Sequence, residues 1–424
     1  MMKIWMTALA VLTTSVGLLA TEGPVKVEVK WDQDHWQFYR DGEPYYVRGV
    51  GGHVHLDEAV AIGANSIRTW GIDNAKVVLD EAHSKGLTVM LGFWMGHERH
   101  GYDYSDAWAV EDQFKSFQKI VRQFKDHPAL LCWGVGNEMD LFYTDFNVWD
   151  AVERIAAMIQ REDPNHPSCV VTAGLDVAEV QMIQERAPSI DILGVNTYGD
   201  VENIITRMDM YGWDKPYMVT EWGPNGHWEV QKTTWGAPVE QTSSEKAASY
   251  KHRYLDCIAA DEESCVGSYV FLWGQKQETT PTWYGVFLED GSQTEALDNL
   301  HRVWKGEEPA NCAPVIASFT LDGKTAYESV TLAPGEKVEV SALITDPDGD
   351  ALIFTWELLP ESQFTKAGGD VERRPDAVQA AVSGGQDGVG VMRMPRIKGA
   401  YRLFVYARDG QGHAATGNLP FYIE

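Results

Sequence analysis

Basic residues are scarce in this chain of 424 residues. Lys and Arg number 35 against 62 Asp and Glu, so the formal net charge is −27. Binding to nucleic acid needs clustered Lys and Arg that neutralise phosphates, and the same shortage disfavours anionic membrane surfaces and polyanionic substrates. The composition therefore excludes the nucleic-acid-binding classes and favours a neutral partner.

Long apolar runs are absent after the first twenty residues. In residues 1–20, Lys3 is followed by an apolar stretch that ends in small residues, which predicts a secretory signal peptide cleaved after Ala20. A membrane anchor is the alternative, but the stretch is short for a span of about 20 residues, and no later segment is apolar enough. We therefore expect an exported protein, periplasmic or secreted, that is not bound to the membrane once the signal is removed.

Cysteine is rare, and its spacing fits no metal site. The five cysteines show none of the paired spacings of structural zinc sites, and an odd number cannot pair completely within one chain. Cys257 and Cys265 are close enough in sequence to form one disulfide in an oxidising compartment. Cys132 and Cys169 lie in strand-like apolar runs, so we expect them to be core residues.

Strand-like and helical segments alternate through most of the chain. After a predicted hairpin over residues 25–48, which turns at Asp41-Gly42, eight short apolar runs are separated by amphipathic helical stretches. Such repeats give parallel strands, and residues 47–305 have about the 250 residues of a (β/α)8 barrel. No G-x-G-x-x-G spacing supports a dinucleotide-binding fold. The predicted strands cover 47–52, 66–70, 87–94, 130–138, 169–174, 190–198, 217–222 and 268–274, and the clearest helices 74–84, 108–124, 148–161 and 244–259.

The pattern changes after Trp304. Residues 306–315 contain two prolines and a charge pair and resemble a linker, and the rest of the chain alternates as strands without any helical pattern. This predicts a small Ig-like β-sandwich. The predicted organisation is α/β: a signal peptide at 1–20, a barrel with its N-terminal hairpin at 21–305, a linker at 306–315 and an Ig-like sandwich at 316–424.

Two glutamates directly end the apolar runs predicted to be strands four and seven. Barrel enzymes carry their reactive side chains at the C-terminal ends of strands. Glu221 follows Glu138 by 83 residues, the length of about three βα units, so both carboxylates belong to the same mouth. In a retaining glycosidase two carboxyl groups about 5 to 5.5 Å apart act on one bond, one protonating the leaving oxygen and the other attacking the anomeric carbon. The pair predicts this chemistry.

The sequence around these glutamates resembles clan A glycoside hydrolases. The motifs are WGVGNE at 133–138, PYMVTEWGP at 216–224, IRTWG at 67–71 and GVNTY at 194–198, and the resemblance covers residues 47–305. The run WGQKQETTPTWYG at 273–285 and the Ig-like tail are most similar to glycoside hydrolase family 158, whose members act on β-1,3-glucan. Several strand ends are also shared with family 2 barrels. The resemblance implies that Glu138 is the acid/base, that Glu221 is the nucleophile and that Asn137 binds the sugar 2-hydroxyl.

Further candidates surround the two glutamates. Arg68 and Tyr198 are expected to hydrogen-bond Glu221 and keep it ionised, whereas apolar neighbours such as Trp133 or Trp94 should raise the pKa of Glu138. Indole rings at strand ends offer flat platforms for the apolar faces of sugars, and Trp273 is expected to form the floor of the subsite where cleavage occurs. The substrate-binding candidates are Arg68, Asn137, Tyr198, Trp273, Trp94, Trp222, His97 and Trp283, and Trp70, Trp228 and Trp235 also fall near strand ends.

Metal and cofactor sites are not expected. His53 and His55 resemble the histidine pair of barrel amidohydrolases, but the later strand ends supply no further ligands. In the tail, Asp346, Asp348 and Asp350 resemble calcium ligands, but the spacing of the loop favours a solvated acidic turn.

The sequence thus predicts a monomeric, exported, retaining glycosidase without a cofactor, and most specifically an endo-β-1,3-glucanase that acts on a neutral β-glucan such as laminarin. A β-mannanase or β-galactosidase is the alternative within the same clan. A non-catalytic glycan-binding barrel and a metal-dependent amidohydrolase are the alternatives from other classes.

Overall fold

The computed structural model describes residues 24–363, 365–379 and 382–424. The predicted signal peptide lies outside these residues. Within them, no helix has both the length and the apolar character needed to cross a membrane.

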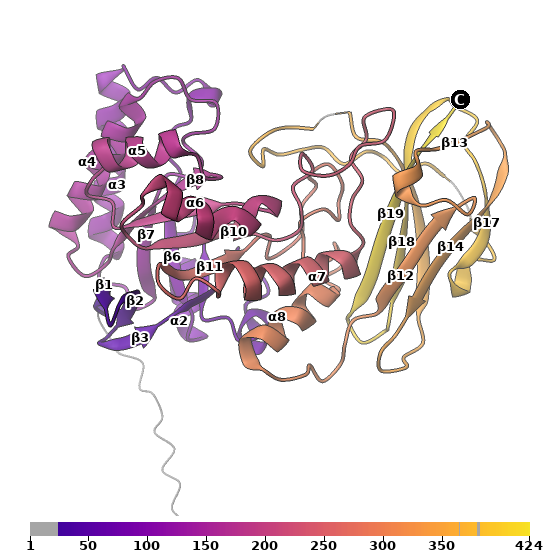
Figure 1. Cartoon of the computed structure of the whole chain (residues 1–424), viewed down its shortest axis with the longest axis horizontal. Coiled ribbons are helices and arrows are strands. Elements are labelled where there is room, and N and C mark those ends of the chain that lie inside the picture. The colour runs from indigo at the N-terminus through magenta and orange to yellow at the C-terminus, as the bar shows by residue number, and fades with distance from the viewer. Residues whose placement is uncertain (1–23, 364, 380–381) are drawn as a thin grey trace, which may run out of the picture.

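Eight parallel strands form a closed barrel, which confirms the predicted fold class (Figure 1). The strands are hydrogen-bonded in chain order, and the last one, β11, pairs with the first one, β4. Strands β6, β7, β10 and β11 are buried along their whole length, as expected where helices cover the outer face of a parallel sheet. The strands are β4 (Val47–Gly51), β5 (Ser66–Arg68), β6 (Thr88–Phe93), β7 (Leu130–Val135), β8 (Ser168–Ala173), β9 (Ile192–Asn196), β10 (Tyr217–Trp222) and β11 (Cys265–Val270).

A helix follows each barrel strand. Asp106 caps α3 by accepting hydrogen bonds from the backbone N–H groups of Trp108 and Ala109, and Thr242 and Glu245 form a capping box at the start of α7. The helices are α1 (Leu56–Ala61), α2 (Ala75–Ser84), α3 (Ala107–Phe124), α4 (Asn147–Glu162), α5 (Val177–Arg186), α6 (Ile204–Tyr211), α7 (Ser243–Arg253) and α8 (Glu295–Lys305). A π-helical turn extends α7 over Tyr254–Ile258, and short 3-10 helices cover Glu98–His100, Gly199–Asn203, Ala326–Glu328 and Gly385–Asp387.

A small antiparallel sheet covers the N-terminal end of the barrel. It consists of β1 (Val27–Asp32), β2 (His35–Arg40) and β3 (Glu43–Tyr45), and the turn between β2 and β3 is Asp41-Gly42. Val27 and Phe38 pack with the side chains that fill the barrel interior, such as Met90 and Tyr269. This end of the barrel is therefore closed, and the C-terminal end is left for chemistry.

Two four-stranded sheets form a β-sandwich after the barrel. One sheet has the order β12-β14-β17-β16 and the other β13-β19-β18-β15, and a separate apolar core lies between them. The predicted β-sandwich is confirmed. Its strands are β12 (Val315–Leu321), β13 (Val330–Leu332), β14 (Lys337–Thr345), β15 (Ile353–Pro360), β16 (Val382–Ser383), β17 (Val389–Arg393), β18 (Gly399–Arg408) and β19 (Ala414–Ile423).

Buried polar contacts fix the sandwich to the barrel. Asn418 of β19 donates to Glu240 Oε2 at 2.6 Å, and Glu240 is paired with Lys246 of α7, both side chains being almost completely buried. Arg402 of β18 donates to the backbone carbonyl of Pro238 at 2.8 Å. Because an unpaired polar group here would pay its full desolvation cost, this network favours one relative placement of barrel and sandwich.

The five cysteines all lie within the described residues and form no disulfide there. All are free, so the candidate bridge between Cys257 and Cys265 is not present. Cys265 lies in β11, where its Sγ is 3.6 Å from the carbonyl oxygen of Gly267, whereas Cys257 belongs to the π-helical turn. Cys132 and Cys169 are fully buried in β7 and β8, as predicted for core residues.

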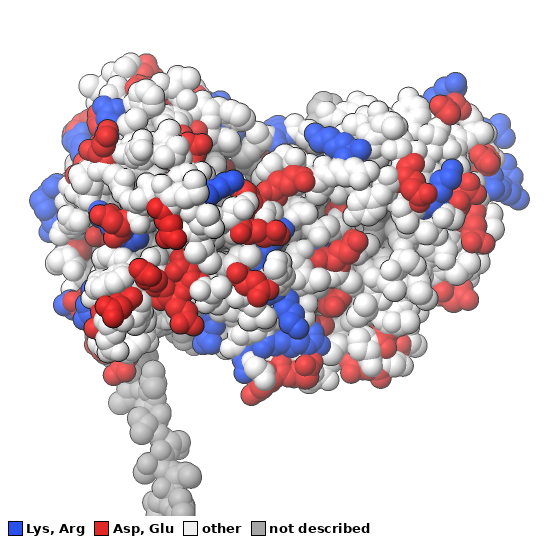
Figure 2. All heavy atoms as spheres, viewed as in Figure 1, with Lys and Arg blue, Asp and Glu red and all other residues white. Residues whose placement is uncertain are grey.

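Acidic side chains are spread over the surface rather than concentrated in one domain. Figure 2 shows Asp and Glu on both halves of the face in view, with Lys and Arg interspersed among them. Among the described residues on this face, Lys and Arg side chains gather at the lower middle of the view and border acidic ones there.

Candidate active site

A large cleft opens at the C-terminal end of the barrel, and Glu138 and Glu221 both line it. Its volume is about 1190 Å³, which exceeds a site for a single small ligand. Glu221 belongs to β10, and Glu138 follows β7 in a left-handed backbone conformation with φ of 52°. The topology therefore brings together two carboxylates that lie far apart in sequence.

Three hydrogen-bond donors surround Glu221. Arg68 Nη1 lies 3.1 Å and Trp70 Nε1 2.7 Å from Oε1, and the Tyr198 hydroxyl donates to Oε2 at 2.9 Å. Burial, followed by the charge of Glu221, raises the pKa of Tyr198 well above its ordinary value, so this phenol keeps its proton and acts as a donor. Charge-assisted hydrogen bonds of this kind favour the ionised carboxylate.

Glu138 has a different environment. Its carboxyl receives one side-chain hydrogen bond, from Asn196 Nδ2 to Oε1 at 2.9 Å. Burial and then the negative charge of Glu221 raise the pKa of Glu138 to about 8. The carboxyl therefore holds a proton at neutral pH. Apolar surroundings were predicted from the sequence to raise this pKa. The contribution of the Glu221 charge was not predicted, because it depends on the closeness of the two carboxyl groups in the structure.

A buried polar network connects the two glutamates. Arg68 is 1% exposed and donates through Nη2 to Asn137 Oδ1 at 2.6 Å and through Nη1 to Asn196 Oδ1 at 3.2 Å. Asn196 also donates to Asn137 Oδ1 at 3.2 Å. Because Arg68 contacts Glu221 and Asn196 contacts Glu138, the network orients both carboxyl groups at once.

Only part of the predicted aromatic set lines the cleft. Trp94 is 43% exposed and Trp228 56% exposed, so both offer indole surface to a ligand. Trp70 also lines the cleft, and it stands nearly perpendicular to Phe271. His97 is 3% exposed and stacks behind Trp94, with ring centroids 4.8 Å apart, so it supports this indole rather than forming the wall.

Trp222, Trp273 and Trp283 are buried and do not line the cleft. Successive side chains of a strand point to opposite faces, so Glu221 points inward and Trp222 packs against Tyr250 of α7 on the outside of the barrel. Trp273 is 1% exposed and donates to the carbonyl of His55, so it is not the floor of the cleft. Trp283 donates to the carbonyl of Asn225 from within an apolar cluster.

Several cleft residues were not predicted. Asn196 lies inside the GVNTY motif, so its position at a strand end was the available signal. Trp70 was expected among the tryptophans near strand ends, but its hydrogen bond to Glu221 was not. Lys276 and Glu278 follow β11 and form an ion pair at 2.7 Å. Residues Ala367, Gly368 and Gly369 come from the sandwich, and no local pattern marked them as part of the cleft.

No group of metal ligands lies in the cleft among the described residues. Among the described residues, the one cluster of three side chains that could hold a metal ion lies in the sandwich. It consists of Asp346, Asp350 and Asp409, whose carboxylates lie within 4.8 Å of one another. Backbone N–H groups of Asp348 and Asp350 donate to Asp346, as in an acidic turn. His55, one of the two histidines that resemble the amidohydrolase pair, stacks on Phe287.

No family model matches the sequence. A β-glucuronidase of Felis catus is 25% identical over 196 residues, which is 41% of this chain and 28% of that protein. Among solved structures, Bacteroides uniformis β-glucuronidase 2 covalently bound to cyclophellitol-6-carboxylate aziridine aligns with a TM-score of 0.52 at 14% identity, covering 94% of this chain and 48% of that one. A putative β-galactosidase from Bacteroides fragilis has a TM-score of 0.51 at 15% identity and covers 94% and 57%.

These comparisons support a clan A glycoside hydrolase barrel. The structural similarity supports the barrel fold. The sequence similarity to β-glucuronidases supports a relationship to glycoside hydrolases. The chain spans less than half of the length of the curated relatives that it matches.

Proposed function

We propose that this protein is a retaining β-glycosidase in which Glu221 is the nucleophile and Glu138 the general acid/base. The observation that carries the proposal is the contrast between the two carboxyl groups in one cleft. Glu221 accepts from Arg68, Trp70 and Tyr198, whereas burial and the charge of Glu221 raise the pKa of Glu138 to about 8. One group is thus prepared to attack and the other to donate a proton.

The reaction follows from these two states. In the first step Glu221 forms a bond to the anomeric carbon, the glycosidic bond breaks, and the proton of Glu138 passes to the leaving oxygen. In the second step Glu138 takes a proton from water, the water oxygen attacks the anomeric carbon, and Glu221 is released. Asn137 Oδ1 accepts from Arg68 and Asn196, so the Nδ2 of Asn137 is available to a sugar hydroxyl in the cleft.

A neutral sugar is the proposed substrate. The cleft is lined by seven carboxylate side chains and three cationic ones, and each cation faces a carboxylate: Lys276 faces Glu278, Arg207 faces Asp200, and Arg253 lies 3.7 Å from Glu202. A uronic acid would add another negative charge among these groups. We therefore propose β-glucan as the substrate, with β-1,3-glucan first because of the family 158 resemblance, and exposed Trp94 and Trp228 as platforms for a polymer.

β-Glucuronidase activity is the second candidate, because the curated relatives carry that name. The two candidates differ by one carboxylate on the sugar. We expect the kcat/KM for 4-nitrophenyl β-glucoside to exceed that for 4-nitrophenyl β-glucuronide by about tenfold or more, since one unpaired like charge in a cleft costs at least about 1.4 kcal/mol. Parallel assays on laminarin, mannan, galactan and cellulose rank the polymers. A preference for the glucuronide would reject the neutral substrate.

The indole N–H of Trp70 should contribute to catalysis. The substitution Trp70→Phe keeps an aromatic ring but removes the donor to Glu221 Oε1, and we expect kcat/KM on an aryl glycoside to fall about 10- to 100-fold, the effect of one charge-assisted hydrogen bond. Trp228→Phe is the matched control, because this indole lines the same cleft at the edge of Tyr198 and is half exposed. Equal losses in both variants would contradict a specific role of the Trp70 N–H.

Export and the monomeric state belong to this proposal as expectations from the sequence. Size-exclusion chromatography with light scattering and mass determination of the mature N-terminus test the two expectations.

A further inference from the structure

A segment of the sandwich crosses to the barrel. Residues 366–374, here called the bridging segment, lie between β15 and β16, and Figure 1 shows the chain between these strands extending from the sandwich toward the barrel. Ala367, Gly368 and Gly369 line the same cleft as Glu138 and Glu221. The cleft is therefore built by both domains.

The middle of the bridging segment is held by charged groups of the barrel. Asp370 Oδ2 accepts from Arg99 Nη1 at 2.9 Å and lies 3.1 Å from His100 Nε2, and both residues belong to the loop after β6. Lys276 Nζ, from the loop after β11, donates to the carbonyl of Gly369 at 3.0 Å. Loops on both sides of the cleft mouth therefore fix this part of the segment.

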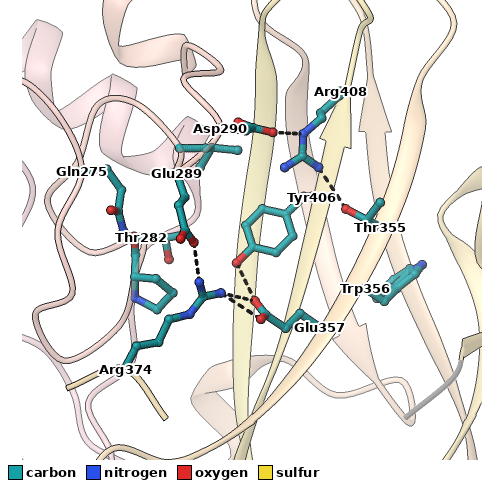
Figure 3. A pocket seen from close by; sticks show the side chains of 12 residues that line it. Gln275, Thr282, Glu289, Asp290, Thr355, Trp356, Glu357, Arg374, Tyr406 and Arg408 are labelled. Carbon is teal, nitrogen blue, oxygen red and sulfur yellow. Dashed lines mark hydrogen bonds and ion pairs between the residues drawn. The ribbon is translucent and has the colours of Figure 1, made fainter. Parts of the chain in front are cut away.

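The end of the bridging segment is anchored by buried and ionic contacts. The side chain of Glu372 is 6% exposed and accepts from the backbone N–H of Thr279 at 2.7 Å and from that of Lys366 at 2.9 Å. Arg374 pairs with Glu357 of β15 and with Glu289 of the barrel, as Figure 3 shows. In the space between the domains drawn there, Arg374 and Arg408 both face acidic partners, so these groups brace the interface.

The two glycines let the bridging segment lie close to the barrel. Gly368 and Gly369 have φ of +63° and +68°, a conformation that favours glycine. A Cβ at Gly368 would lie 2.7 Å from Leu141 Cδ2, in the loop that carries Glu138, and 2.8 Å from Arg99 Nη2. The result is a stretch of cleft wall without large side chains, whose carbonyls accept from Arg99 and Lys276.

We infer that the bridging segment is a substrate-binding wall, and that the backbone of residues 367–369 contacts a sugar unit of the glucan chain outside the subsite where cleavage occurs. This inference rests on the proposed function. The wall lines the cleft but forms no hydrogen bond with Glu138 or Glu221, so a short aryl glycoside does not depend on it, whereas an oligosaccharide does. Arg99 and Asp370 then act as positioning residues for substrate length.

The test compares two substrates in the wild-type protein and four variants. The variants are Arg99→Ala, Asp370→Ala and the double variant, and Arg408→Ala is the control, because its ion pair with Asp290 joins the two domains without touching the bridging segment. Kinetics are measured on 4-nitrophenyl β-glucoside and on a β-1,3-linked glucohexaose, together with the thermal unfolding midpoint. We expect KM for the hexasaccharide to rise about fivefold in each Arg99 or Asp370 variant, because the loss of one partly buried ion pair lowers the population of the bridging segment in its bound position. KM for the aryl glycoside should change by less than about twofold.

The double variant should show less than the combined effect of the two single ones, because both substitutions remove the ion pair between Arg99 and Asp370. Equal changes on the two substrates, an unchanged KM for the hexasaccharide, or the same effect in Arg408→Ala would overturn the inference and leave the proposed function intact. A wild-type protein that hydrolyses neither substrate would overturn both.

Discussion

The substitution Glu221→Gln should lower kcat by about 10⁴-fold or more on every glycoside, whatever the leaving group, because the amide cannot form the glycosyl bond. The site should tolerate this change. The oxygen of the new amide can still accept from Arg68 and Trp70, and the Tyr198 hydroxyl can rotate to accept from its NH₂ group. Arg68 also keeps its bonds to the Thr220 carbonyl and to Asn137, so its guanidinium is not left unpaired. We therefore expect the thermal unfolding midpoint to change little compared with the loss of activity.

Covalent trapping identifies the residue directly. A 2-deoxy-2-fluoro glycoside with a good leaving group should add one sugar to the wild-type protein, on the peptide that contains Glu221, and none to Glu221→Gln. Glu278→Gln is the matched control, because Glu278 is another buried carboxylate of the same cleft. This variant should still be labelled. A sugar found on a peptide without Glu221, or loss of labelling in the control, would reject Glu221 as the nucleophile.

The positions of the two carboxylates could be predicted because the barrel is a regular repeat. Apolar runs locate the strands, and parallel strands in a closed barrel place all their C-terminal ends on one face. Glu138, Glu221, Arg68, Asn137 and Tyr198 each stand at the end of such a run, and all five belong to one hydrogen-bonded network. The strand pattern and the chemistry of the side chains together were sufficient for this part of the site.

The aromatic residues show where such reasoning fails. A tryptophan at a strand end can point into the barrel mouth or outward to the helices, and the direction depends on a single residue of register. Trp222 immediately follows Glu221 and points the opposite way, whereas Trp70 lies two residues after Arg68 and reaches the same carboxylate. Tryptophan composition alone therefore overestimated the number of sugar platforms.

The bridging segment could not be predicted for a different reason. Its contacts with Arg99 join residues about 270 positions apart, and neither partner lies in a periodic pattern. Gly368 and Gly369 have no side chain whose chemistry could point to a site. Contacts of this kind depend on the placement of one domain on the other, which is set by buried polar groups such as Glu240 and Asn418 rather than by any local signal.

The substitution Glu138→Ala should affect substrates according to their leaving groups. Hydrolysis of β-glucan, whose leaving sugar needs a proton, should fall about 10³- to 10⁴-fold, while the first step on a dinitrophenyl glycoside should change by less than about tenfold. The glycosyl-enzyme should then accumulate, because no base remains to activate water. Azide, which needs no base, should restore turnover and give a β-glycosyl azide. Equal losses on both substrates would contradict the role of Glu138 as acid.

The pH profile gives an independent measure of the same group. Glu138 must be protonated in the first step, and its pKa in the free protein is about 8, so kcat/KM on the polymer should be maintained below that pH and fall as the pH rises through it. This basic limb should disappear in Glu138→Ala on the activated substrate. Asp140→Asn is the control: the charge of Asp140 adds to the raised pKa of Glu138, and its removal should shift the limb to lower pH without any new dependence on the leaving group.

The shift of the Glu138 pKa also explains how one residue serves both steps. Part of the increase comes from the negative charge of Glu221, and that charge is absent while Glu221 carries the sugar. The pKa of Glu138 must therefore fall in the glycosyl-enzyme, where the second step requires a base. Titration of Glu138 by 13C NMR in the free and fluoro-sugar-trapped protein should show this decrease, and an unchanged pKa would mean that burial alone controls the proton.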